Sequence, residues 1–116
     1  MLEFGCTNVH LAAGSTDLRK GIEGLALIVQ ECFGLDPFSK GLYVFCNKSR
    51  DKLKILRWDD TGFWLYYKRL EKARFRWPDG KSNALTVSNR ELRWLLDGLS
   101  LSQKTAHKQV TERAVV

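Results

Sequence analysis

The sequence predicts a single α+β domain, built as an antiparallel β-meander of about four strands with two helices packed on one face. Two observations carry this prediction. Short runs rich in aromatic and β-branched residues, separated by turn residues, fill positions 42–77. Stretches with apolar residues at helical spacing lie on either side of that region, at 16–34 and 88–101. We expect the domain to span residues 1–101 and the polar segment 102–116 to be a flexible tail.

A strand and a helix are expected first. The run at 9–13 is apolar and is bounded by a glycine, which is typical of a strand. Apolar residues then recur at helical spacing as far as Val29. Ser15 or Thr16 is the expected N-cap of this helix, and Gly34 is placed to end it.

The first turn of this helix contains residues that oppose it. Arg19 and Lys20 place positive charge where the helix dipole favours negative charge, and Gly21 and Gly24 each cost the helix about 1 kcal/mol relative to alanine. One interpretation is an anion site, in which the two cations lie beside free backbone amides. The other is that the glycines pack tightly against the sheet while a cation pairs with a nearby aspartate. The sequence leaves both open.

The meander is expected to contain four strands, at 42–46, 52–58, 63–70 and 74–77. The first of these is apolar almost throughout, as a central strand would be. The segment Asp59-Asp60-Thr61-Gly62 has the pattern of a type I turn in a hairpin.

The second helix has a clear start signal. Ser88 followed three residues later by Glu91 is a capping box, and Val87 with Leu92 forms a hydrophobic staple. The leucines that follow form an apolar stripe at helical spacing.

The net charge of the chain is concentrated in the meander. Ten of the 19 Lys and Arg residues lie between Asn47 and Arg76 against four carboxylates, which accounts for the whole net charge of +6. Aromatic residues are interleaved with these cations. Such a surface can neutralise a nucleic-acid backbone and stack on bases. The alternative is that these are ordinary strand formers whose charges keep an outer face soluble.

Alternation along the strands assigns the side chains to two faces. We expect one face to display Lys52, Lys54, Arg74 and Arg76, and either Trp64, Tyr66 and Lys68 or Phe63, Leu65, Tyr67 and Arg69 from the third strand. The register of that strand is not fixed by the sequence. The candidate nucleic-acid contacts are Arg19, Lys20, Lys48, Arg50, Lys52, Lys54, Lys68, Arg69, Arg74 and Arg76, with Trp64 and Tyr66 as stacking rings.

The sequence points away from an enzyme. His10 and His107 have no partners at metal-ligand spacing, and the common nucleotide-binding and hydrolase motifs are absent. We therefore expect no catalytic residues, metal or cofactor. Three cysteines without a C-x-x-C pair fit reduced thiols, and we expect Cys32 and Cys46 to be buried. The sequence shows no membrane span or signal peptide, which favours a cytoplasmic protein.

Three consecutive blocks of the sequence resemble a known family. They are STDLRKGIEGLALIVQ (15–30), GLYVFCNKSRDKLKILRWDDTGFWLYYKRLEKARFRWP (41–78) and LTVSNRELRWLLDGLSL (85–101). The most specific patterns are T-D-x-R-K-G and N-K-x-R-D-x-L-K-x-L-x-W-D-x-x-G-F-W-L, which occur together. Over residues 9–101 the chain is similar to TnpB, the second open reading frame of IS 66 type bacterial insertion sequences. That family is unrelated to the RNA-guided nucleases of the same name.

This resemblance implies an accessory protein of DNA transposition, encoded beside a separate, larger transposase that supplies the catalytic acidic residues. It carries over no catalytic residues. For a protein that works with transposon DNA, nucleic-acid contact becomes the preferred interpretation of the basic strands. The alternative is an adaptor, whose aromatic face and Trp94 would bind the transposase or a second copy of the chain as a homodimer.

Overall fold

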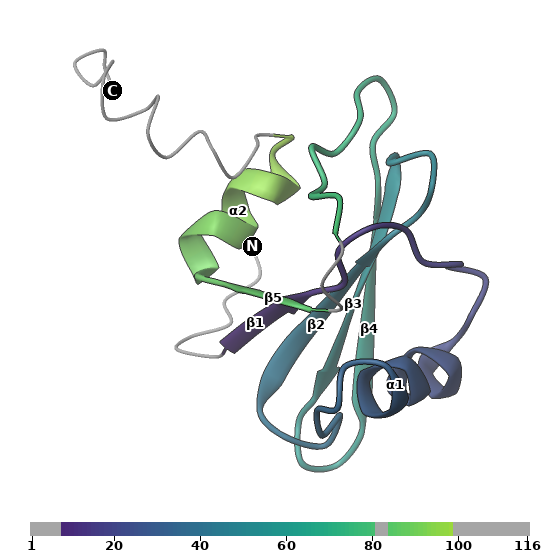
Figure 1. Cartoon of the computed structure of the whole chain (residues 1–116), viewed down its shortest axis with the longest axis vertical. Helices are drawn as coiled ribbons and strands as arrows, with labels where there is room; N and C mark the ends of the chain where they lie inside the picture. Colours follow the sequence, from purple (N-terminus) through teal and green to yellow (C-terminus); the bar gives the residue numbers. More distant parts are fainter. Residues whose placement is uncertain (1–7, 81–83, 99–116) are drawn as a thin grey trace.

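The computed structural model describes residues 8–80 and 84–98, which form a five-stranded sheet and two helices (Figure 1). The elements are β1 (Asn8–Leu11), α1 (Ile22–Glu31), β2 (Gly41–Cys46), β3 (Lys52–Trp58), β4 (Phe63–Arg69), β5 (Leu85–Val87) and α2 (Asn89–Leu96). The predicted α+β class is confirmed. The expected tail lies outside the described residues, and the extent of the domain stays a prediction.

The sheet is mixed, with the strand order β4-β3-β2-β1-β5. β2, β3 and β4 form an antiparallel meander, and β5 pairs antiparallel with β1. β1 and β2 are parallel, because α1 connects them as a crossover on one side of the sheet. The expectation of an antiparallel meander therefore holds for three of the strands and not for the sheet as a whole.

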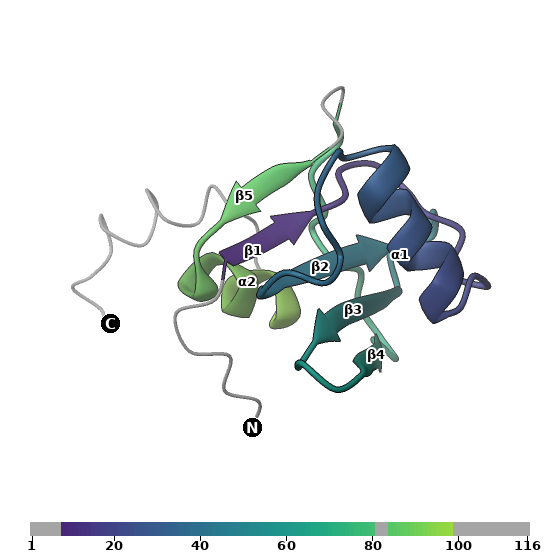
Figure 2. The same ribbon diagram turned by 90° about the horizontal axis from the view of Figure 1, so that it is seen from below.

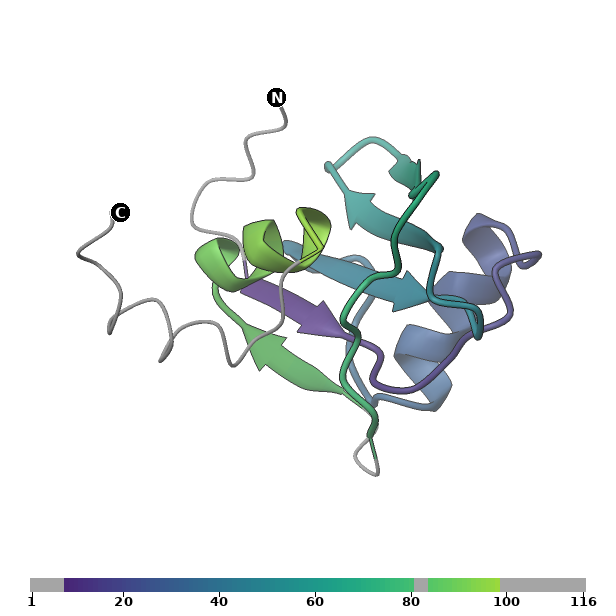
Figure 3. The same ribbon diagram turned by 90° about the horizontal axis from the view of Figure 1, so that it is seen from above.

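The two helices lie on opposite faces of the sheet (Figures 2 and 3). α1 packs through Leu25 and Val29 against a buried cluster that includes Phe45. α2 packs through Leu92 and Leu95 against a second buried cluster. We call these sides of the sheet the α1 face and the α2 face. The prediction that both helices share one face is wrong, because every residue of the central strand β2 is buried and each of its faces needs a cover.

The segment expected as the last strand is irregular in structure but alternates as predicted. Phe75 and Trp77 are buried in the α2-face cluster, while Arg74 and Arg76 are exposed. The Phe75 amide donates to the Arg50 carbonyl at 2.7 Å. The segment therefore covers the α2 face instead of extending the sheet, and β1 and β5 supply the remaining strands (Figure 3).

The first helix begins later than the sequence predicts. It starts at Ile22 with Gly21 at its N-cap, so Arg19 and Lys20 lie before the helix and not in its first turn. A side chain at Gly21 would meet nothing within 4 Å, and one at Gly24 would meet Lys20. The interpretation that these glycines pack tightly against the sheet is therefore wrong. The later start relieves the charge conflict, because both cations lie outside the helix.

Some of the other local predictions are confirmed, and others are wrong. The capping box at Ser88 is present, with its hydroxyl accepting from the Glu91 amide and the Glu91 carboxylate accepting from the Ser88 amide. The hairpin after β3 is also present, but Asp60 has a φ of 80°, which a type I turn does not allow at that position. Cys46 is buried as expected, whereas Cys32 is exposed. Within the described ranges, neither helix is long and apolar enough to cross a membrane.

Candidate nucleic-acid interface

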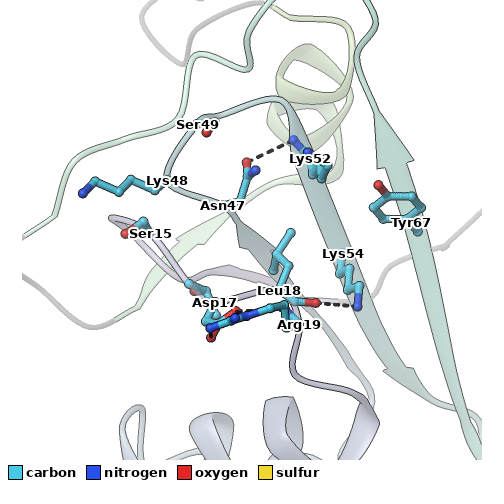
Figure 4. A pocket seen from close by; sticks show the side chains of 11 residues that line it. Ser15, Asp17, Leu18, Arg19, Asn47, Lys48, Ser49, Lys52, Lys54 and Tyr67 are labelled. Atoms are coloured by element: carbon cyan, nitrogen blue, oxygen red, sulfur yellow. Dashed lines mark hydrogen bonds and ion pairs between the residues drawn. The ribbon is translucent and has the colours of Figure 1, made fainter.

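A pocket of about 800 Å³ opens on the α1 face, next to the loop that leads into α1 (Figure 4). Three parts of the chain line it: the loop 15–19, the turn 47–49, and the strands β3 and β4. Its cationic side chains are Arg19, Lys48, Lys52 and Lys54, and Tyr67 lines one side. We call this site the basic pocket. Four cations, from the loop before α1, the turn after β2 and strand β3, thus line one concavity.

The pairing of β3 with β4 decides which side chains share the face of the basic pocket. Lys52 lies opposite Arg69 and Lys54 lies opposite Tyr67, and residues directly opposite in an antiparallel pair project from the same face. Trp64 and Tyr66 therefore belong to the α2 face, as their alternation with Tyr67 requires. Of the two sets left open by the sequence, the one containing Tyr67 and Arg69 shares the face of Lys52 and Lys54.

Asn47 organises the turn that carries Lys48 into the pocket. Its side-chain oxygen accepts from the amides of Asp51 and Lys52, each at 3.1 Å. Its side-chain nitrogen donates to the Asp51 carboxylate at 2.8 Å. These bonds close a tight loop between β2 and β3 and help to position Lys48 and Lys52.

The opposite wall is held by the buried side chain of Leu18 and by Lys54. The ammonium group of Lys54 donates to the carbonyl of Leu18 at 2.7 Å and to that of Lys20 at 3.4 Å. The amide of Thr16 donates to the carbonyl of Cys46 at 2.8 Å. Lys54 therefore has two effects here: it fixes the loop before α1 and it adds positive charge to the basic pocket.

Arg19 and Asp17 form an ion pair at the rim of the pocket. The guanidinium lies 2.9 Å from the carboxylate, and the Arg19 amide also donates to it at 3.0 Å. Hydrogen bonds from the Arg19 side chain, and next from its amide, lower the pKa of Asp17 to about 2. The interpretation that pairs a cation with a nearby aspartate is thus confirmed for Arg19. The pair is exposed, so it can open towards a ligand at small cost.

Two of the predicted contacts are engaged in holding the fold together. Arg50 has a φ of 63° and donates to the carbonyl of Trp77, and its guanidinium forms an ion pair with Asp79 at 2.6 Å. Lys68 donates to the carbonyl of Leu96 at 2.8 Å, at the C-terminal end of α2. A cation there complements the helix dipole. Neither residue lines the basic pocket.

The remaining predicted contacts do not line the pocket. Lys20 lies before α1, and Arg69 forms an ion pair with Glu71 at 2.9 Å. Arg74 and Arg76 are exposed on the segment that covers the α2 face. Trp64 and Tyr66 stack with ring centroids 6.1 Å apart, and the Trp64 indole donates to Asp59 at 2.6 Å. The expected continuous surface of cations and these two rings is thus divided between the two faces of the sheet.

Sequence reasoning omitted Tyr67 from the candidate contacts. Alternation had already grouped Tyr67 with Arg69, but only the register with β3 shows that this group shares the face of Lys52 and Lys54. Ser15, Thr16 and Ser49 also line this pocket. The sequence indicated Ser15 or Thr16 only as the helix N-cap, which is wrong because the N-cap is Gly21. Across residues 8–80 and 84–98, the structure brings together no group of three or more His, Cys, Asp or Glu side chains that could hold a metal ion.

Comparison with known proteins identifies relatives over most of the chain. The model of a family described as "IS66 Orf2 like protein" matches residues 7–106. The uncharacterized protein y4hO of Sinorhizobium fredii is 41% identical over 91 residues, which cover 78% of this chain and 79% of that protein. A second uncharacterized protein of the same organism, y4jC, is 34% identical over 91 residues, which cover 78% of each chain. No solved structure matches the chain.

Proposed function

Because this chain belongs to the IS66 Orf2-like family of insertion sequences, we propose that it is a non-catalytic accessory protein of DNA transposition that contacts transposon DNA through the basic pocket. The family match supports the association with an insertion sequence. The proposal of DNA contact rests on the geometry of the α1 face.

One observation carries this proposal: cations from three separate parts of the chain converge on one open pocket. Asp17 and Asp51 partly offset Arg19 and Lys52, at 2.9 Å and 3.4 Å. Lys48 and Lys54 form no ion pair with any described residue, so the pocket keeps an excess of positive charge. Nucleic-acid phosphates are the abundant polyanions that such an excess attracts.

The chemistry of the lining predicts weak sequence preference. Lysine and arginine contacts to phosphate fix position and orientation but do not read base identity. The sequence also contains no recognised major-groove motif. Recognition of the transposon ends would then depend on the transposase.

The direct test is binding of the purified protein to a labelled transposon-end duplex and to a scrambled duplex across a salt series. Contact with about three phosphates gives a slope of about −3 when the logarithm of affinity is plotted against the logarithm of salt concentration. Both duplexes should bind with similar affinity. A slope near zero, or no binding at low salt, would contradict the proposal.

A second candidate function is an adaptor that binds the transposase or a second copy of the chain. The observation that favours it is the exposure of Trp64, which is 51% accessible on the α2 face. Exposed aromatic residues of this kind are typical anchors of protein interfaces. Trp64→Ala would then abolish co-purification with the transposase, or the homodimer, and leave DNA retention unchanged. Trp94, the other candidate anchor, is only partly exposed.

A further inference from the structure

We propose that the basic pocket holds an unpaired nucleotide, so that the protein binds single-stranded DNA in preference to duplex, with a base stacked on Tyr67 and the adjoining phosphate held by Lys48 and Lys52. This inference rests on the proposed function and specifies the form of DNA that the same site takes. Its basis is the shape of the pocket, the ring on its wall and the placement of its cations.

The shape of the pocket favours a single strand. Its volume of about 800 Å³ is large enough to admit a base with its sugar and phosphate. Walls from the loop 15–19 and the turn 47–49 make it concave, and it is open to the surface, so a single nucleotide can enter it from outside. A duplex keeps its bases inside the stack, so it could offer this site only its phosphates.

Tyr67 provides the stacking surface. Its side chain is 54% exposed, and it projects beside Lys54 from the neighbouring strand. In Figure 4 the ring stands at one side of the pocket and Lys48 at the opposite side. A base lying against an exposed aromatic ring gains about 1–3 kcal/mol, whatever its identity, because every base has a flat π face.

The polar groups of the pocket match the rest of a nucleotide. Lys48 and Lys52 lie at the two ends of the turn closed by Asn47, and their ammonium groups can bind phosphate oxygens. The hydroxyl groups of Ser15, Thr16 and Ser49 can donate to or accept from the sugar and the base edge. A charged group, a flat apolar surface and small polar groups therefore meet within one cavity.

The opposite face offers an internal comparison. Trp64 is 51% exposed on the same strand as Tyr67, but it belongs to the α2 face and its indole nitrogen is bonded to Asp59. It does not line the basic pocket. If exposed rings bound single strands without regard to their surroundings, Trp64 would contribute as much as Tyr67. If the basic pocket is the site, only Tyr67 contributes.

The experiment measures fluorescence anisotropy of a labelled oligonucleotide of about 20 nucleotides, single-stranded and as its duplex, at the same salt concentration. We expect the single strand to bind roughly tenfold more tightly than the duplex. Tyr67→Ala and Tyr67→Leu should each lower affinity for the single strand by roughly tenfold and leave that for the duplex within about twofold. Trp64→Ala should retain the affinity of the unaltered protein, and Tyr67→Phe, which keeps the ring, should lose less affinity than Tyr67→Leu.

The outcomes separate this inference from the proposed function. Equal affinity for the two forms, tighter binding of the duplex, or Tyr67 variants that bind single strands normally would overturn the inference and leave DNA contact intact. Absence of salt-dependent binding to either form would overturn both. Tyr67→Leu preserves an apolar strand residue, so a folding defect confined to Tyr67→Ala leaves the test decisive.

Discussion

Lys54 lies directly opposite Tyr67 in the antiparallel pairing of β3 and β4, so both side chains project from the α1 face of the sheet. This pairing places an exposed ring beside a lysine, at a pocket whose other walls come from loops. It also separates the pocket from Trp64 and Tyr66, which occupy the α2 face. The basic, aromatic-rich meander therefore contains two different surfaces.

Lys54 should contribute to stability as well as to charge. Its ammonium group is bonded to the carbonyls of Leu18 and Lys20, and a charged hydrogen bond of this kind contributes about 1–2 kcal/mol. Lys54→Met should lower the free energy of unfolding by about that amount in urea denaturation. The control is Lys40→Met, which removes an exposed lysine just before the first residue of β2. Equal stability of the two variants would show that Lys54 does not hold the loop.

Lys68, which the sequence placed among the DNA contacts, should act on the helix instead. Its ammonium group binds the carbonyl of Leu96 at the C-terminal end of α2. Lys68→Gln should reduce the free energy of unfolding by about 0.5 kcal/mol while leaving affinity for DNA within about twofold of the unaltered protein. The two quantities are measured by urea denaturation and by anisotropy. A large loss of affinity with unchanged stability would restore Lys68 to the interface.

In the irregular segment after β4, alternate residues should contribute to the stability of the core. Phe75 is 2% exposed in the α2-face cluster, so Phe75→Ala should cost about 3–5 kcal/mol of the free energy of unfolding. Its neighbour Arg74 is exposed, and Arg74→Ala should change stability by less than about 0.5 kcal/mol. Thermal or urea unfolding of the two variants compares their stabilities directly. Similar losses would mean that the segment does not cover the sheet.

Asp59 should make stability depend on acid pH. Hydrogen bonds from the Trp64 indole, and then from the Thr61 amide, lower the pKa of this carboxylate from 3.8 to about 2. Because the folded state lowers the pKa, the stabilisation is present above about pH 4 and is lost as the pH falls towards 2. Urea unfolding of Asp59→Asn between about pH 2 and pH 5 should therefore show a shallower decline than the unaltered protein.

The control for that experiment lies next in the chain. Asp60→Asn removes a carboxylate that forms no hydrogen bond with any described residue, and asparagine tolerates the positive φ found at Asp60. Its pH profile should follow that of the unaltered protein. If Asp59→Asn followed the same profile, the hairpin carboxylate would have no part in acid stability.

Local signals in the sequence predicted the local structure well. The capping box at Ser88, the alternation of Phe75 and Trp77 with their arginine neighbours, and the apolar central strand at 42–46 all correspond to observed features. Each depends on residues close together in the chain. The uniformly apolar β2 also contained evidence for burial on both faces, which the prediction of two helices on one face overlooked.

Features that depend on contacts between distant segments could not be predicted from local signals in the sequence. The parallel pairing of β1 with β2 and the pairing of β1 with β5 join residues more than 30 positions apart. The choice between Tyr67 and Trp64 required the register of β4 against β3. The loop before α1 is held by a bond between Thr16 and Cys46, which are 30 positions apart in the chain. Composition located the charge correctly, but tertiary contacts divided it between a pocket, a helix cap and an exposed segment.

The most direct measurement compares two double variants that remove the same number of charges. Lys48→Gln with Lys52→Gln alters the basic pocket, whereas Arg74→Gln with Arg76→Gln alters the segment over the α2 face. The pocket variant should lose roughly tenfold or more in affinity for DNA and reduce the salt slope by about 2, while the other stays within about threefold. Equal losses, or a larger loss from the arginine variant, would contradict binding at the pocket.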